Sequence, residues 1–318
     1  MSLVNGLLYA AVTLVGSLVA GLYVFQENLL YHPSIPTRRY EENPNDYLMA
    51  YRDIFLETED GIRIHGNISH RLSDVQHFYS RVACNVLMVS YRGYGDSEGR
   101  PSEKGIQRDA AAAFRFIRSC ELIDPRQLFV FGRSIGGAVA ISLAQRFQRE
   151  IKGVVVENTF TSIDDMIDYV LPALRWCKFL NRNKWNSAAS VSSLTCPILF
   201  LSGLRDELVP PKLMQQLYDL ATHSVYRQMV TFPDGTHNDT WFRGGRMEFP
   251  FHHRRLAQLR GKTWNDFVRK ALKEPKRTEA LSRTTFEMTK SEWSEGKVAK
   301  RESLTQEAER NNVSSSNK

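Results

Sequence analysis

The most constraining feature of the sequence is the stretch Phe129–Gly137, which reads Phe-Val-Phe-Gly-Arg-Ser-Ile-Gly-Gly. The apolar run Leu128–Phe131 predicts a buried strand, and a run of helix-forming residues begins directly after the stretch. Between them, Gly132, Ser134 and Gly136 fit the pattern Gly-x-Ser-x-Gly, in which a tight strand-to-helix turn exposes the serine hydroxyl. Glycine and serine are common in turns, so an ordinary strand-to-helix loop is the simpler alternative. The strand and the helix around the pattern favour a nucleophile elbow.

Strand and helix patterns alternate along the chain on both sides of this motif. Apolar runs predict further strands at Asn85–Tyr91, Ile151–Glu157, Pro197–Ser202 and Gln228–Phe232. Helical spacing and helix-start residues predict helices at Ser69–Val82, Ser102–Ser119 and Lys212–Thr222. This alternation is typical of a mostly parallel sheet flanked by helices, so we expect an α/β fold.

Two segments complete this plan. Tyr51–Leu56 and Ile62–His65 flank the triplet Glu59-Asp60-Gly61, and an Asp-Gly turn between two such runs predicts a β-hairpin. The apolar side chains of Thr159–Trp185 predict either a helical cap over a site or an excursion that packs against the sheet.

The chain carries a candidate catalytic triad in the order serine, acid, histidine. Ser134, Asp206 and His237 each lie just beyond the carboxyl end of a predicted strand, where open α/β sheets bind ligands. A serine hydroxyl is a poor nucleophile unless an imidazole takes its proton, and the acid holds that imidazole in the correct tautomer. Taken singly, Asp206 also fits a turn cap and His237 a surface histidine. Glu207 is the rival acid.

An oxyanion formed at Ser134 needs backbone donors. The Ile135 N–H, at the start of the following helix, is the first candidate. A second donor is expected in His65-Gly66-Asn67, which makes Gly66 and Asn67 oxyanion-hole candidates.

Composition bounds the remaining possibilities. With 318 residues, 42% of them hydrophobic, the chain is long enough for one large α/β domain with appendages. The net charge of +7 is mild and no recognition motif accompanies it, so we expect no nucleic-acid partner. The four cysteines are scattered and form no Cys-x-x-Cys pair, so we expect no zinc site, and the candidate chemistry needs no cofactor.

The stretch Val4–Phe25 has the length of a membrane span and contains no charged residue. It predicts a transmembrane anchor over residues 1–30, followed by a linker over 31–50. A cleaved signal peptide would need a basic start and a shorter apolar stretch, and a buried core helix would be amphipathic.

The orientation of this single-pass anchor stays open. Arg38 and Arg39 favour a cytoplasmic domain by the positive-inside rule. Glycosylation sequons begin at Asn67, Asn238 and Asn312, and a lumenal domain is the alternative. An endomembrane or the plasma membrane would fit either arrangement.

As a set, these motifs resemble the alpha/beta-hydrolase superfamily, and more closely its wavy-growth and bud-emergence branch. The matching stretches, besides the apolar N-terminus, are residues 85–99, 132–137, 157–160, 202–210 and 237–241. The resemblance implies a membrane-anchored serine hydrolase whose triad falls on Ser134, Asp206 and His237. It also implies a lipid or acylated substrate, cleaved at a long-chain acyl ester or thioester.

The chain departs from this family pattern in two places. Between Asp60 and Asn85 the fold normally has two strands, the oxyanion loop and a helix, but about twenty-five residues leave room for one strand and a helix. Either Ile62–His65 fills the vacant place beside the elbow strand, or this is a shortened form with impaired activity. We expect the hydrolase domain over 51–272, with an atypical segment at 242–262 and a disordered polar tail at 273–318.

Two other functions compete with catalysis. The shortened region and the polar tail also fit a non-catalytic, membrane-tethered interaction protein, whose protein partners the sequence does not identify. A hydrolase-like lipid carrier is the third possibility, and lipid that co-purifies without turnover would distinguish it.

Overall fold

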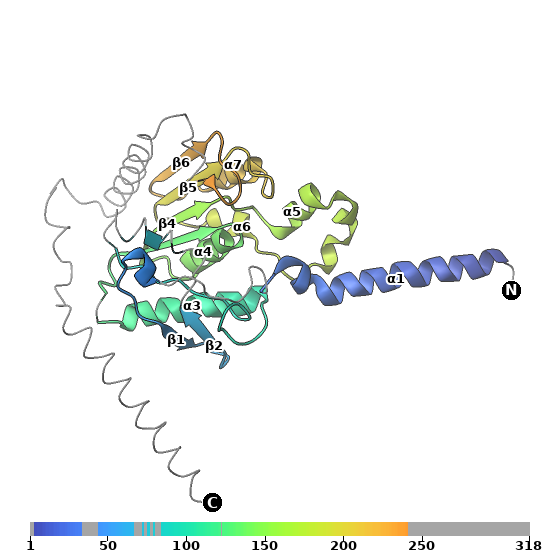
Figure 1. The fold of residues 1–318 in the computed structure, drawn as a ribbon. Helices are drawn as coiled ribbons and strands as arrows, with labels where there is room; N and C mark the ends of the chain where they lie inside the picture. The colour runs from blue at the N-terminus through green and yellow to red at the C-terminus, as the bar shows by residue number, and fades with distance from the viewer. Residues whose placement is uncertain are drawn as a thin grey trace, which may run out of the picture. The chain divides into compact units, whose positions relative to one another are not determined.

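A computed structural model describes residues 3–33, 44–66, 84–121 and 123–240, with the single positions 72, 75, 76 and 79 (Figure 1). Those four positions belong to the helix predicted at Ser69–Val82, and all four are helical. Half of the predicted linker 31–50 (residues 34–43) and all of 242–262 and 273–318 lie outside the described residues, so the predictions made for them stay predictions.

A parallel four-stranded sheet forms the centre of the domain, as the alternating pattern predicts (Figure 1). Its strands follow the chain in the order β3-β4-β5-β6. They are β3 (Leu128–Arg133), β4 (Ile151–Glu157), β5 (Ile198–Gly203) and β6 (Arg227–Phe232). Because all four run in one direction, their carboxyl ends meet at one edge of the sheet.

Helices α4 (Ile135–Arg146), α6 (Ser187–Val191) and α7 (Pro211–Leu220) lie between successive strands, and α3 (Glu103–Ser119) precedes β3. The Ser102 hydroxyl caps α3 by accepting a hydrogen bond from the Gly105 N–H. Successive strand residues point to opposite faces, so one core contains Val154, Val156 and Phe200 with side chains of these helices. The alternate residues Val155, Leu199 and Leu201 form a second cluster.

The predicted β-hairpin is confirmed, and it stands apart from the main sheet. Strands β1 (Ile54–Glu57) and β2 (Arg63–Gly66) pair antiparallel. The turn between them contains Gly61 with a φ of 74°, a left-handed conformation that glycine adopts without a steric penalty.

The prediction of a strand at Asn85–Tyr91 is wrong. This segment is irregular, and the one bridge that it makes with other described residues joins Ser90 to His65 of β2. The apolar run correctly indicates partial burial, but a strand also needs a neighbour along its length, and β2 pairs instead with β1.

The place beside the elbow strand is therefore not taken by Ile62–His65, which was one of the two expectations. Among the described strands, β3 stands at the end of the order β3-β4-β5-β6, where it pairs with β4, and β2 belongs to a separate sheet. Its burial agrees with that position, because Phe131 is 36% exposed whereas every residue of β5 is buried.

The N-terminal helix α1 (Leu3–Leu30) contains a candidate membrane span at Asn5–Leu30. None of its most apolar window is buried, which does not fit a core helix of a soluble domain. After β4, α5 (Ile163–Val170) and the 3₁₀ helix η3 (Pro172–Leu180) form an excursion from the sheet (Figure 1). A short 3₁₀ helix, η1 (Pro44–Tyr47), precedes the hairpin.

Candidate active site

Ser134 occupies the sharp turn between β3 and α4. Its φ of 54° and ψ of −125° lie outside the ordinary regions for a residue with a side chain. Three hydrogen bonds hold this strained backbone: the Ser134 N–H donates to the Glu157 carbonyl (2.9 Å), and the Gly137 N–H (2.9 Å) and the Thr159 hydroxyl (2.7 Å) donate to the Ser134 carbonyl. The hydroxyl of Ser134 does not cap α4, so it is available for another role.

The glycines around Ser134 have different steric requirements. A Cβ on Gly132 would lie 2.0 Å from the backbone oxygen of Gly136, which no real structure tolerates. A Cβ on Gly137 would lie 2.6 Å from the Thr159 Cβ. A Cβ on Gly136 would meet only the Tyr91 hydroxyl, at 4.0 Å. The close approach of the strand to the helix therefore depends on the absence of a side chain at Gly132.

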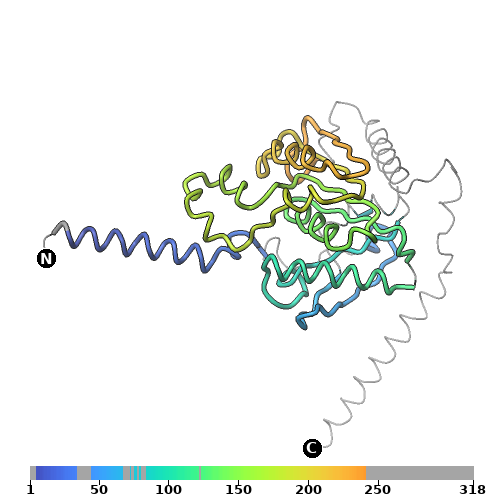
Figure 2. Tube along the Cα trace, turned by 180° about the vertical axis from the view of Figure 1, so that it is seen from behind, coloured from blue at the N-terminus to red at the C-terminus, as the bar shows by residue number. Residues whose placement is uncertain are grey.

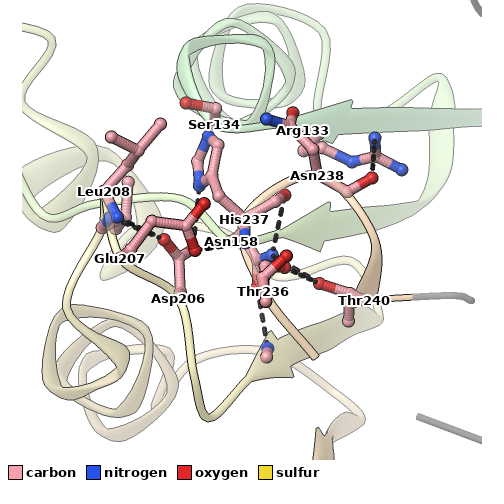
Figure 3. A network of polar contacts seen from close by, with 12 residues as sticks. Arg133, Ser134, Asn158, Asp206, Glu207, Leu208, Thr236, His237, Asn238 and Thr240 are labelled. Atoms are coloured by element: carbon pink, nitrogen blue, oxygen red, sulfur yellow. Dashed lines mark hydrogen bonds and ion pairs between the residues drawn. The ribbon is translucent and has the colours of Figure 1, made fainter. Parts of the chain in front are cut away.

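Asp206 and His237 are joined by a hydrogen bond. The Oδ2 atom of Asp206 lies 2.8 Å from Nδ1 of His237, and both side chains are buried (Figure 3). The other carboxylate oxygen of Asp206 accepts hydrogen bonds from the N–H groups of Leu208 (2.9 Å) and Val209 (2.8 Å). These bonds fix the carboxylate so that its free oxygen faces the imidazole.

Glu207, the rival acid, contacts a different part of the histidine. Its Oε2 accepts a hydrogen bond from the backbone N–H of His237 at 3.2 Å. The structure therefore pairs the imidazole with Asp206, whereas Glu207 holds the loop that carries it.

Ser134 follows β3 and His237 lies in the loop after β6, so both lie beyond the carboxyl ends of strands of one parallel sheet, and Figure 3 shows the imidazole between Asp206 and Ser134. Among the described residues, the Ser134 hydroxyl makes no hydrogen bond. Catalytic hydrogen bonds are often long in a ligand-free enzyme and tighten when the substrate binds. Within the same residues, no three His, Cys, Asp or Glu side chains are grouped to hold a metal ion.

The predicted oxyanion donors differ in how they are placed. Ile135 is the first residue of α4, so its N–H has no acceptor within the helix. Gly66 ends β2, where it pairs with Ile54, and in the described part of the chain no hydrogen bond joins it to the elbow. Asn67 lies outside the described residues. The roles of these residues stay predictions.

Asn158 is a positioning residue that the sequence analysis did not identify. It is 1% exposed and has a φ of 44°, a conformation that asparagine adopts more readily than most residues. Its amide nitrogen donates to the carbonyls of Thr236 (3.0 Å) and His237 (3.1 Å) and to the Thr240 hydroxyl (2.6 Å) (Figure 3). Its amide oxygen accepts from the Gly203 N–H at 2.8 Å. One side chain at the end of β4 thus ties the histidine loop to the end of β5.

A buried ion pair supports the same edge. Arg133 and Glu157 are register partners in β3 and β4, and their side chains approach to 3.1 Å. Glu157 is fully buried, so its charge depends on this partner. Arg133 also reaches the carbonyl of Asn238 at 3.5 Å, next to His237.

A parallel sheet with a strained serine turn at one strand end and an acid–histidine pair at the same edge defines the class of α/β hydrolase folds. The model of the family described as alpha/beta hydrolase fold matches residues 75–177. The Arabidopsis thaliana protein named alpha/beta hydrolase domain-containing protein WAV2 is 38% identical over 281 residues, covering 77% of this chain and 91% of the relative. The chain belongs to the alpha/beta hydrolase family.

Other similar proteins agree with this assignment. An uncharacterized membrane protein of Saccharomyces cerevisiae is 36% identical over 71% of this chain and 88% of its own length. The Schizosaccharomyces pombe protein bem46 is 35% identical over 74% of this chain and 87% of its own length. A solved structure of the Pyrococcus furiosus esterase Pf2001 superposes with a TM-score of 0.53 at 19% identity, over 73% of this chain and 95% of the esterase. That last likeness shows the fold.

We predict that Gly132→Ala destabilises the protein and Gly136→Ala does not. The first substitution forces the strand and the helix apart, with an overpacking cost of about 1–3 kcal/mol or more. The second places a methyl group in open space within a helix. Urea unfolding of the full chain in detergent, followed by circular dichroism, measures both free energies. Equal effects would show that the close approach at Gly132 is not required.

We predict that Asn158→Gly lowers the turnover rate of an ester substrate, because the His237 loop loses its hydrogen bonds to Asn158. A displacement of about 1 Å costs on the order of 10²-fold in rate. Glycine tolerates the left-handed backbone, so this variant separates the lost hydrogen bonds from strain. We expect kcat to fall while KM changes little, and an unchanged kcat would contradict the positioning role.

Proposed function

We propose that this protein is a membrane-anchored serine hydrolase that cleaves an acyl ester or thioester. The observation that carries the proposal is the 2.8 Å hydrogen bond between Asp206 and His237, at the sheet edge where Ser134 occupies a strained elbow. The buried carboxylate stabilises the imidazolium that forms when His237 accepts a proton. Strain that the surrounding hydrogen bonds maintain at one serine is typical of a functional site.

In the proposed mechanism, Ser134 Oγ attacks the carbonyl carbon of the substrate while His237 takes the hydroxyl proton. The Ile135 N–H stabilises the oxyanion, together with a second donor for which Gly66 and Asn67 are the candidates. The intermediate collapses to an acyl-enzyme, and His237 passes its proton to the departing alcohol or thiol. Water then attacks the acyl-enzyme by the same route in reverse, releasing a carboxylic acid and restoring Ser134.

The family and the N-terminal helix support the proposed substrate class. The helix α1 is long and apolar enough to anchor the protein in an endomembrane or the plasma membrane as a single-pass protein. The similar yeast protein is named a membrane protein, and a solved neighbour in the fold is named an esterase. An enzyme anchored in this way lies close to lipids and acylated molecules of the bilayer, which supports such a molecule as the substrate.

Labelling with a fluorophosphonate probe tests the nucleophile. We expect the wild-type chain to be labelled covalently and Ser134→Ala to remain unlabelled, because the probe reacts only with an activated serine. Ser193→Ala, which removes an exposed hydroxyl far along the chain from the elbow, serves as the matched control and retains labelling. Equal labelling of wild type and Ser134→Ala would show that Ser134 is not the nucleophile and would contradict the proposed mechanism.

A second experiment distinguishes the two neighbouring acids. Asp206→Asn removes the carboxylate that holds the imidazole, and we expect a loss of about 10⁴-fold in kcat, as for a triad aspartate. Glu207→Gln keeps an oxygen that can accept from the His237 backbone N–H, so its effect is expected to be far smaller. Steady-state hydrolysis of a short-chain p-nitrophenyl ester measures both. A larger loss for Glu207→Gln would reverse the assignment.

One observation favours a second candidate function. About twenty-five residues separate Asp60 from Asn85, fewer than the fold normally has there, and among the described residues Asn85–Tyr91 forms no regular strand. A chain altered in this way would suit a non-catalytic, membrane-tethered interaction protein. This candidate would be supported by a folded wild-type protein that does not react with the fluorophosphonate probe but retains protein partners in a pull-down.

A further inference from the structure

The excursion formed by α5 and η3 exposes large apolar side chains to solvent. Trp176 is 75% exposed and Phe179 is 79% exposed, and the same segment also exposes Tyr169, Val170 and Leu171. We call these five residues the η3 platform. Scattered apolar residues are normal on a protein surface, but a run of large ones within one short segment indicates an interaction site.

The local geometry gathers the two most exposed side chains on one edge. Residues three positions apart superpose along a 3₁₀ helix, so Trp176 and Phe179 point to the same side of η3. The guanidinium of Arg175 lies 4.7 Å from the centroid of the Trp176 ring. An indole and a phenyl ring beside an exposed cation suit the boundary between lipid tails and phosphate head groups.

The platform is attached to the polar end of α1. Gln26 donates to the Leu180 carbonyl at 3.2 Å and accepts from the Arg182 N–H at 2.7 Å. The Arg182 guanidinium pairs with Glu27 at 2.6 Å and lies 4.8 Å from the Tyr23 ring. Both views show the C-terminal end of α1 beside this excursion (Figures 1 and 2).

Buried contacts hold this attachment in place. Tyr31, directly after α1, is 2% exposed; its hydroxyl accepts from the Trp185 indole (2.8 Å) and donates to Asn183 (3.0 Å). Burial raises the pKa of Tyr31 above its ordinary value, so the hydroxyl remains a donor. Asn183 in turn donates to Glu27 at 3.2 Å. The end of the helix and the end of the excursion are therefore one packed unit.

The position of α1 sets the level of the platform relative to a bilayer. An apolar helix of about 20 residues crosses the hydrocarbon core, so the first polar side chains after it mark the lipid–water boundary. In α1 these are Gln26 and Glu27, the residues that bind η3 and the residues after it.

We propose that the η3 platform is a second membrane contact, in which Trp176 and Phe179 enter the head-group region of the bilayer that α1 spans. This inference rests on the membrane anchor in the proposed function, and its partner is the lipid bilayer. The excursion leaves the sheet directly after Asn158, at the edge that carries Ser134 and His237. Membrane contact at the platform would therefore hold this edge of the domain close to substrates in the bilayer.

Quenching of tryptophan fluorescence by brominated lipid tests the proposal on the full chain. The protein is reconstituted into vesicles of phosphatidylcholine and phosphatidylglycerol, with or without bromine on the acyl chains. The emission of Trp176 is the difference between wild type and Trp176→Phe. We expect brominated lipid to remove most of this difference, and to quench a tryptophan placed by Phe179→Trp in the Trp176→Phe background.

A matched control uses an exposed apolar residue remote from the platform in the chain. Val225, between α7 and β6, is 67% exposed, and Val225→Trp in the Trp176→Phe background is expected to give the same emission in both lipids. Emission from Trp176 that brominated lipid does not change, or quenching equal to that of Val225→Trp, would overturn the proposal. A concentration-dependent blue shift of Trp176 without quenching would also overturn it, in favour of a second copy of the chain.

Flotation of the vesicles and probe labelling separate this inference from the proposed function. A chain that does not float with vesicles lacks the anchor, which overturns the platform as well. A chain that floats but shows no quenching of Trp176 overturns the platform alone. Labelling of Ser134 by the fluorophosphonate probe reports on the catalytic proposal independently of either result.

Discussion

The candidate site depends on the close approach of β3 and α4 at Gly132. The backbone must pass from strand to helix within one residue, and that residue is forced to a φ of 54°. A non-glycine residue in this region is costly, so the surrounding structure has to maintain it. Here the carbonyl of Glu157, the Thr159 hydroxyl and the missing side chain at Gly132 do so together. The elbow is thus a product of β3, β4 and α4 in combination.

The same edge of the sheet holds the histidine through contacts that the chain order does not reveal. Asp206 orients the imidazole, Glu207 holds the backbone of His237, and Asn158 binds both sides of the loop. Asp206 and Glu207 follow β5, Asn158 follows β4, and His237 lies in the loop after β6. Parallel pairing of β4, β5 and β6 is the constraint that brings them to one place.

The edge of the sheet at β3 shows how far a local pattern can mislead. The apolar run Asn85–Tyr91 has the composition of a strand, and it is irregular because only Ser90 finds a backbone partner in the hairpin. An apolar run predicts that a segment is buried. A β-strand also requires an adjacent strand with which its backbone can form hydrogen bonds. The short spacing between Asp60 and Asn85 was the signal in the sequence that this region departs from the usual plan.

The sequence by itself determined the α/β plan, the elbow motif, the order of Ser134, Asp206 and His237 and the apolar N-terminal helix. These features depend on local periodicity, turn chemistry and strand ends, which neighbouring residues specify. Only the tertiary structure decided that Asp206, rather than Glu207, faces the imidazole, that Asn158 holds the histidine loop, and that η3 lies beside the end of α1. Those contacts join residues far apart in the chain, and packing and hydrogen-bond geometry select them after the strands have paired.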